Sequence, residues 1–170
     1  MNRPQPLVRI PVGVVIERRK AKSPWAESIW RPVAVLPGVP DTAPWTMLKG
    51  NDERANFYGG DAEIQLYRSD TGGYRDNLAM DAALLWVVLR PTGIEPPYQI
   101  VAVTAEPSEG EAFTESATDL VDTVPMPELV RAAIAEFVSE HHVEDPFVKR
   151  KRDRANPEVM ARRPLSKDRT

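Results

Sequence analysis

The sequence predicts an α+β fold: a mostly antiparallel β-sheet of about five or six strands, a C-terminal helix packed on it, and a basic, disordered tail. First, 42% of the 170 residues are apolar, which is enough to bury one sizeable core. Second, several short segments alternate polar and apolar residues, as half-buried strands do, whereas one late segment has helical apolar spacing. Third, apolar periodicity stops before residue 149. We therefore expect a single domain over residues 1–148 and a tail over residues 149–170.

The first two strands are predicted near the N-terminus. Every even position of residues 8–16 is apolar, the period of a strand with one buried face. Pro11 places this strand at an edge or a bulge, because proline has no N–H to donate. A polar turn over residues 18–24 leads to a second strand over residues 29–36.

The middle of the chain is predicted to be more irregular. Residues 39–54 are rich in proline, glycine, asparagine and aspartate, so they predict a long loop that Trp45 pins. Alternation returns at residues 62–68 and predicts a strand, and residues 72–78 predict one or two helical turns.

Three further strands are expected before the last helix. Residues 84–89 are apolar on both faces, so we expect them at the centre of the sheet. Residues 98–105 follow as a hairpin partner across a loop that contains proline, and residues 120–124 predict a short strand.

The clearest predicted element is the C-terminal helix. Pro127 suits its first turn, and Glu128 complements the helix dipole there. We expect its apolar stripe to fix the helix against the sheet, so that Phe137→Ala is more damaging than any change in the tail. That stripe consists of Leu129, Val130, Ala133, Ile134, Phe137 and Val138.

Two adjacent histidines, His141 and His142, fall at the end of this helix. A helix C-terminus favours a protonated imidazole, and we expect one ring to pack inward as part of a helix cap. A metal site with Glu144 or Asp145 is the alternative, although adjacent helical side chains project about 100° apart and are poorly placed to share one ion. We predict no bound cofactor.

Composition excludes several kinds of chemistry. The chain has no cysteine, so it can form no disulfide, thiolate zinc site or iron–sulfur cluster of its own. Its longest near-continuous apolar run, residues 82–89, is far shorter than a membrane span, and residues 1–10 do not resemble a signal peptide. We therefore expect a cytoplasmic protein. The two glycine pairs form neither a Walker loop nor a dinucleotide fingerprint.

Two segments are candidates for binding. Trp25, Trp30, Arg31 and Trp45 could form an aromatic and cationic surface for a nucleotide base or a partner, or could be packed anchors. Residues 149–170 carry nine basic and three acidic residues, a net charge of +6, which leaves −9 on the remainder. A basic tail on an acidic body is typical of an interaction protein. The tail's candidate binding residues are Lys149, Arg150, Lys151, Arg152 and Arg154.

Taken in order, several segments resemble a proteobacterial domain-of-unknown-function family whose members are often encoded beside molybdenum-dependent formate dehydrogenase genes. The segments are VGVVIERRKAKSPWAESIWRPVAVLPG, YRDNL, LWVVLR, VPMPELV and FVSEHHVEDPFVKRKRDR. The resemblance implies a cytoplasmic accessory role around that enzyme or its cofactor. Some similar sequences bear the name of the molybdopterin-guanine dinucleotide nucleotidyltransferase, but that enzyme's glycine-rich loop is absent, since residues 12–20 contain one glycine.

Three functions remain open on the sequence. The first is a non-catalytic accessory protein that binds formate dehydrogenase or its maturation factors. The second is an enzyme or carrier of molybdenum-cofactor synthesis that binds a pterin or nucleotide near the tryptophans. The third, nucleic-acid binding by the tail, is disfavoured because the acidic body repels phosphate.

Overall fold

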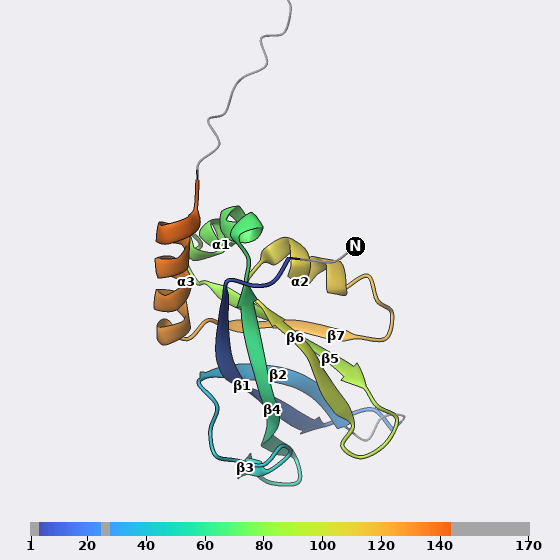
Figure 1. Cartoon of the computed structure of the whole chain (residues 1–170). Helices are drawn as coiled ribbons and strands as arrows, with labels where there is room; N and C mark the ends of the chain where they lie inside the picture. Colours follow the sequence, from blue (N-terminus) through green and yellow to red (C-terminus); the bar gives the residue numbers. More distant parts are fainter. Residues whose placement is uncertain (1–3, 25–27, 144–170) are drawn as a thin grey trace, which may run out of the picture.

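The computed structural model describes residues 4–24 and 28–143 and confirms the α+β class. The described residues form two antiparallel sheets rather than one, with seven strands in all (Figure 1). The first sheet has the order β2-β1-β4-β3, with β1 over Val8–Lys20, β2 over Ser28–Pro37, β3 over Met47–Gly50 and β4 over Arg54–Leu66. The second has the order β6-β5-β7, with β5 over Leu84–Pro91, β6 over Tyr98–Thr104 and β7 over Leu120–Pro125.

Helices lie over one end and one side of the sheets (Figure 1). A short 3-10 turn over Arg68–Asp70 leads into α1, over Thr71–Leu78, where the helical turns were predicted. The other helices are α2, over Pro107–Phe113, and α3, over Glu128–His141. In the described part of the chain, no helix is long and apolar enough to cross a membrane.

Strands β1 and β4 are the longest strands of the first sheet. The buried face of β1 is the one that the alternation of residues 8–16 predicted. Val12, Val14 and Ile16 are fully buried. Val15, on the opposite face, is also buried, at 6% exposure, beside its cross-strand partner Tyr58. Pro11 was predicted to mark an edge or a bulge. The edge is wrong, because β1 lies between β2 and β4, and the bulges in the ladders of β1 lie at residues 14–16 rather than at Pro11. Pairing with β2 begins one residue later, however, so no ladder bond from Pro11 to β2 is lost.

The two sheets share one core. β4 lies beside β6 and β2 beside β7, so the strands surround the core as an incomplete barrel. Apolar side chains from both sheets and from α1 and α3 form one buried cluster. As predicted, β5 is central in its sheet and pairs with β6. On its other side it pairs with β7.

Helix α3 packs into this core with part of its predicted stripe. Val130, Ile134 and Phe137 are buried, and the Phe137 ring lies 6.1 Å from that of Tyr74 in an edge-on arrangement. Leu129 does not belong to the buried face, because its side chain lies in the first turn at 72% exposure. The helix thus has a narrower apolar face than its sequence predicted.

Asn77 ties α1 to the second sheet. Its side-chain nitrogen donates to the carbonyl oxygens of Leu84 and Ala105, at 2.8 and 2.9 Å, and its oxygen accepts from the Leu84 N–H at 3.0 Å. Asn77 is 1% exposed, and these three bonds satisfy its amide. The contact fixes the helical end of the molecule to β5 and to the end of β6.

Candidate functional site

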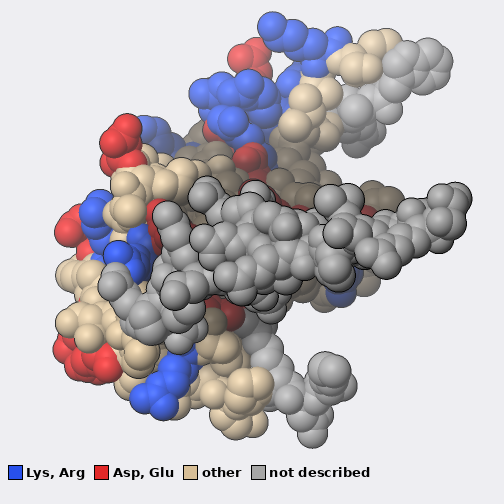
Figure 2. Space-filling view, turned by 90° about the horizontal axis from the view of Figure 1, so that it is seen from above, with Lys and Arg blue, Asp and Glu red and all other residues tan. Residues whose placement is uncertain are grey.

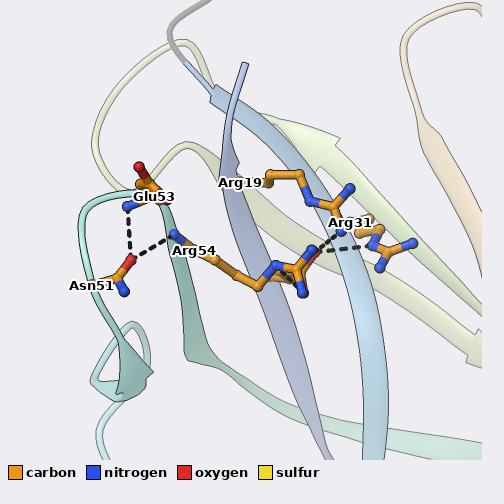
Figure 3. Close-up of polar contacts among 6 residues, drawn as sticks. Arg19, Arg31, Asn51, Glu53 and Arg54 are labelled. Atoms are coloured by element: carbon orange, nitrogen blue, oxygen red, sulfur yellow. Dashed lines mark hydrogen bonds and ion pairs between the residues drawn. The ribbon is translucent and has the colours of Figure 1, made fainter. Parts of the chain in front are cut away.

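A buried carboxylate with three arginines around it lies on the β1–β2 hairpin. The Glu17 side chain is 9% exposed, and Oε1 lies 3.2 Å from Arg31 Nε and 3.8 Å from Arg19 Nη2. Its Oε2 lies 3.8 Å from Arg54 Nε. Figure 3 shows the arginine side chains converging from β1, β2 and β4. We call these four residues the arginine cluster.

Strand register explains why these residues meet. Glu17 is directly opposite Arg31 on β2, and Arg19 is directly opposite Arg54 on β4. Side chains alternate faces along a strand, so Glu17 and Arg19, two residues apart, lie on one face. Cross-strand partners share that face, which brings all four side chains together.

The turn between β3 and β4 helps to position Arg54. Asn51 Oδ1 accepts hydrogen bonds from the Glu53 and Arg54 N–H groups at 2.9 and 3.1 Å (Figure 3). The Asn51 N–H also donates to the Arg54 carbonyl at 2.9 Å. These bonds give the start of β4 a defined backbone geometry, so the Arg54 side chain extends from a fixed backbone position.

Glu17 engages only part of the N–H donors that its arginines carry. Arg31 and Arg54 face Glu17 with Nε, and among the described residues the terminal nitrogens of these two arginines have no other side-chain partner. Arg90 is different: its Nε and Nη2 both bind Asp119, at 2.9 Å each. That hydrogen-bonded pair lowers the pKa of Asp119. The cluster therefore offers guanidinium forks to an external anion, whereas Arg90 is committed to an internal one.

The surroundings of the cluster are also basic. A shallow depression of about 490 Å³ beside it is lined by Arg19, Lys20, Lys22 and Arg54, with Glu53 as its one acidic side chain. In the space-filling view, Lys and Arg side chains gather at one end of the described surface (Figure 2). Anions approaching this end meet a net positive surface on a body that is acidic as a whole.

The predicted aromatic and cationic surface is only partly assembled. Trp30 and Trp45 do meet, with ring centroids 5.7 Å apart, and Trp30 also contacts Phe57 and Tyr98. Both tryptophans are half-buried against the core. Arg31 follows Trp30 in β2 and therefore points to the other face of the strand, toward Glu17. Trp25 lies outside the described residues.

The two histidines have separate partners. His142 is the C-cap residue of α3, and its N–H donates to the Val138 carbonyl at 2.8 Å, as a cap requires. Its ring nitrogens lie 3.0 Å from Thr71 Oγ1 and 3.2 Å from Arg75 Nη1. His141 packs on Phe137, with ring centroids 4.6 Å apart. Because Arg75 can only donate, the facing His142 nitrogen is an acceptor in this contact.

Part of the predicted metal and tail chemistry cannot be placed. Glu144, Asp145 and the basic residues from Lys149 to Arg154 lie outside the described residues. Within residues 4–24 and 28–143, no three histidine or acidic side chains are grouped to hold a metal ion.

Sequence reasoning found one member of the arginine cluster, Arg31, and missed the other three. Spacing in β1 could have indicated that Glu17 and Arg19 share a face. Arg54 could not have been found this way, because its place depends on the register between β1 and β4.

Comparison with known proteins gives a family and no nearer relative. No curated protein and no solved structure matches the chain significantly. A family model described as "Protein of unknown function (DUF3305)" matches residues 11–151, which include the whole arginine cluster. Since this match covers most of the 170 residues, the chain belongs to the DUF3305 family.

Proposed function

We propose that this protein is a non-catalytic accessory protein that docks on an acidic surface of a partner protein through Arg19, Arg31 and Arg54. One observation carries the proposal: a single buried carboxylate anchors these arginines, while no other side chain in residues 4–24 and 28–143 pairs with the terminal nitrogens of Arg31 and Arg54. The planar guanidinium fork matches a carboxylate with two parallel hydrogen bonds. A partner's aspartate and glutamate side chains would fit such a surface.

Anchoring by Glu17 matters for affinity. A free surface arginine loses rotamer freedom when it binds, and an exposed ion pair is therefore worth only about 0.2–1 kcal/mol. In the cluster, Glu17 already restricts the arginines, so less entropy is lost on docking. Several such pairs formed together favour fast, salt-sensitive association with an acidic partner.

For the partner, we propose molybdenum-dependent formate dehydrogenase or one of its maturation factors. The support for this identity is the sequence resemblance, whose first segment contains Glu17, Arg19 and Arg31. An accessory role also suits an interaction surface that is open rather than enclosed.

Affinity purification from the native host tests the proposal. The full chain carries a tag, and proteins retained by the wild type are compared with those retained by the double variant Arg31→Gln/Arg54→Gln. Arg68→Gln/Arg131→Gln removes the same charge elsewhere and is the matched control. We expect the first variant to lose the partner and the control to keep it. Equal retention by both variants would rule out docking through the cluster.

A second candidate function uses the same nitrogens. Guanidinium forks also bind phosphate, so the cluster could hold the phosphate of a nucleotide or pterin in molybdenum-cofactor synthesis. GTP or molybdopterin with Mg²⁺ at millimolar concentration would then raise the melting temperature, because a ligand of the folded state stabilises it. A shift that Arg31→Ala abolishes would favour this function over protein docking. No shift would leave docking as the function of the cluster.

A further inference from the structure

A second surface lies where the two sheets meet, between β4 and β6. β6 is an edge strand of its sheet, and β4 pairs with β3 only over Ala55–Phe57. The Tyr58 N–H and carbonyl bond to Thr46 and Trp45 in the loop before β3. From Gly59 to Leu66, the edge of β4 that faces β6 has no strand partner in the described part of the chain. β4 and β6 run side by side without forming a ladder (Figure 1). Each of the two strands therefore has backbone donors and acceptors along this edge that no neighbouring described strand pairs with.

A bulge in each strand shapes this seam. The register of β4 against β1 leaves Gly59 as an extra residue, and that of β6 against β5 leaves Val101 as one. The strands touch beside these bulges, since a Cβ on Gly60 would lie 3.6 Å from Ile100 Cδ1. Bulges bend a strand and increase its twist, which prevents the two edges from closing into one continuous sheet.

Beyond this contact there is a groove of about 470 Å³, lined by both strands. On β4, Asp61, Glu63 and Gln65 line it. The Tyr58 hydroxyl donates to Asp61, and Arg9 lies 3.3 Å from Glu63. The Arg9 and Glu63 side chains are both 49% exposed, so the pair is weak and easily exchanged. The groove is therefore acidic, the opposite of the arginine cluster.

We propose that this groove binds an extended, positively charged segment of a partner protein by strand addition. The backbone of the segment would hydrogen-bond to the open edges of β4 and β6, and its lysine or arginine side chains would face Asp61 and Glu63. Main-chain bonds supply affinity in this mode and alternate side chains supply specificity. Charge complementarity selects a cationic segment over an acidic one.

This site is independent of the proposed docking site. Glu63 pairs with Pro11 in the β1–β4 ladder, six residues before Glu17 on β1, which corresponds to roughly 20 Å along the strand. A partner with an acidic surface and a basic extended segment would engage both sites. Loss of either site by mutation would leave the other intact.

Peptide binding to the full chain tests the proposal. The probe is a fluorescently labelled eight-residue peptide of alternating valine and lysine, and binding is followed by fluorescence anisotropy. A second peptide is N-methylated at alternate residues, which keeps its charge and removes backbone donors. We expect the methylated peptide to bind at least tenfold more weakly, and a peptide with glutamate in place of lysine not to bind. Equal binding of the methylated and unmethylated peptides would overturn strand addition.

Variants of the protein locate the site. Glu63→Lys should weaken binding of the unmethylated peptide at least fivefold, whereas Glu136→Lys, an exposed charge reversal on α3, should not change it. Hydrogen exchange should show new protection in residues 101–104 when the peptide binds. Protection elsewhere only, or equal effects of both variants, would overturn the assignment. Binding that appears only after the basic residues from Lys149 to Arg154 are replaced by serine would show that the chain's own segment takes the groove, and would overturn the partner proposal.

Discussion

Neutralising Glu17 tests whether this carboxylate holds the arginine cluster together. Glu17→Gln keeps the size of the side chain and removes the charge that Arg19, Arg31 and Arg54 share. Gln can still accept one hydrogen bond, so the variant removes the electrostatic part of the interaction. Glu63→Gln is the matched control, because Glu63 contacts one arginine at the surface.

The expected loss of unfolding free energy follows from the distances between Glu17 and its arginines and from the exposure of the arginine side chains. One contact, from Arg31 at 3.2 Å, is a charged hydrogen bond, a class worth about 1.5–3 kcal/mol, and the two at 3.8 Å are weaker. The arginine side chains are 46–59% exposed, so water screens part of this attraction. We expect Glu17→Gln to lower the free energy of unfolding by about 1–2 kcal/mol, and Glu63→Gln by less than about 0.5 kcal/mol.

Urea denaturation at low salt measures both variants. The midpoint should fall for Glu17→Gln and stay close to that of the wild type for Glu63→Gln, with similar slopes. Equal midpoints for the two variants would show that Glu17 does not anchor the arginines. A loss above about 4 kcal/mol would also contradict the argument, because it would require partners that water cannot reach.

Three further predictions concern the fold. Phe137→Ala should cost about 3–5 kcal/mol in unfolding free energy and Leu129→Ala under about 1, because Phe137 is 3% exposed and Leu129 is 72% exposed; thermal or urea denaturation compares them. Burial, with Asp61, raises the pKa of Tyr58 to about 12. Because unfolded tyrosine ionises near pH 10, Tyr58 should stabilise the fold fully below about pH 10 and lose this contribution as the pH rises toward 12. Tyrosinate absorbance should show a late step that is absent in Tyr58→Phe. Truncation after Val148 should change the unfolding free energy by less than about 1 kcal/mol, since the removed sequence has no apolar periodicity; unfolding of the truncated chain would refute this.

Elements whose burial follows a local period could be predicted from the sequence. Alternation located β1 and the second half of β4, the apolar run located β5, and helical spacing located α3. Each of these patterns depends on residues within one element. By contrast, β3 lies in the segment 39–54 that the sequence predicted as a loop, and neither residues 55–61 of β4 nor α2 were predicted. α2 has little apolar periodicity; it begins at Pro107, and the Glu106 side chain caps it.

Burial that depends on distant segments could not be predicted. Val15 is on the outer face of β1 by period, yet it is buried next to Tyr58, more than forty residues later. Leu129 has the right spacing to face the core, but its side chain is exposed in the first turn of α3. The arginine cluster follows the same rule: its arginines come from three strands, so only the sheet register brings them to Glu17.

Hydrogen exchange on the complex captured from the native host tests docking through the arginine cluster most directly. The tagged wild-type chain is measured alone and with its co-purified partner. We predict that amide protection increases at residues 17–20, 28–31 and 51–54, the strand ends and turn that carry Glu17, Arg19, Arg31 and Arg54. Helix α3 should show no change. Protection confined to α3, or no change at the hairpin in a complex that is demonstrably intact, would contradict docking at this surface.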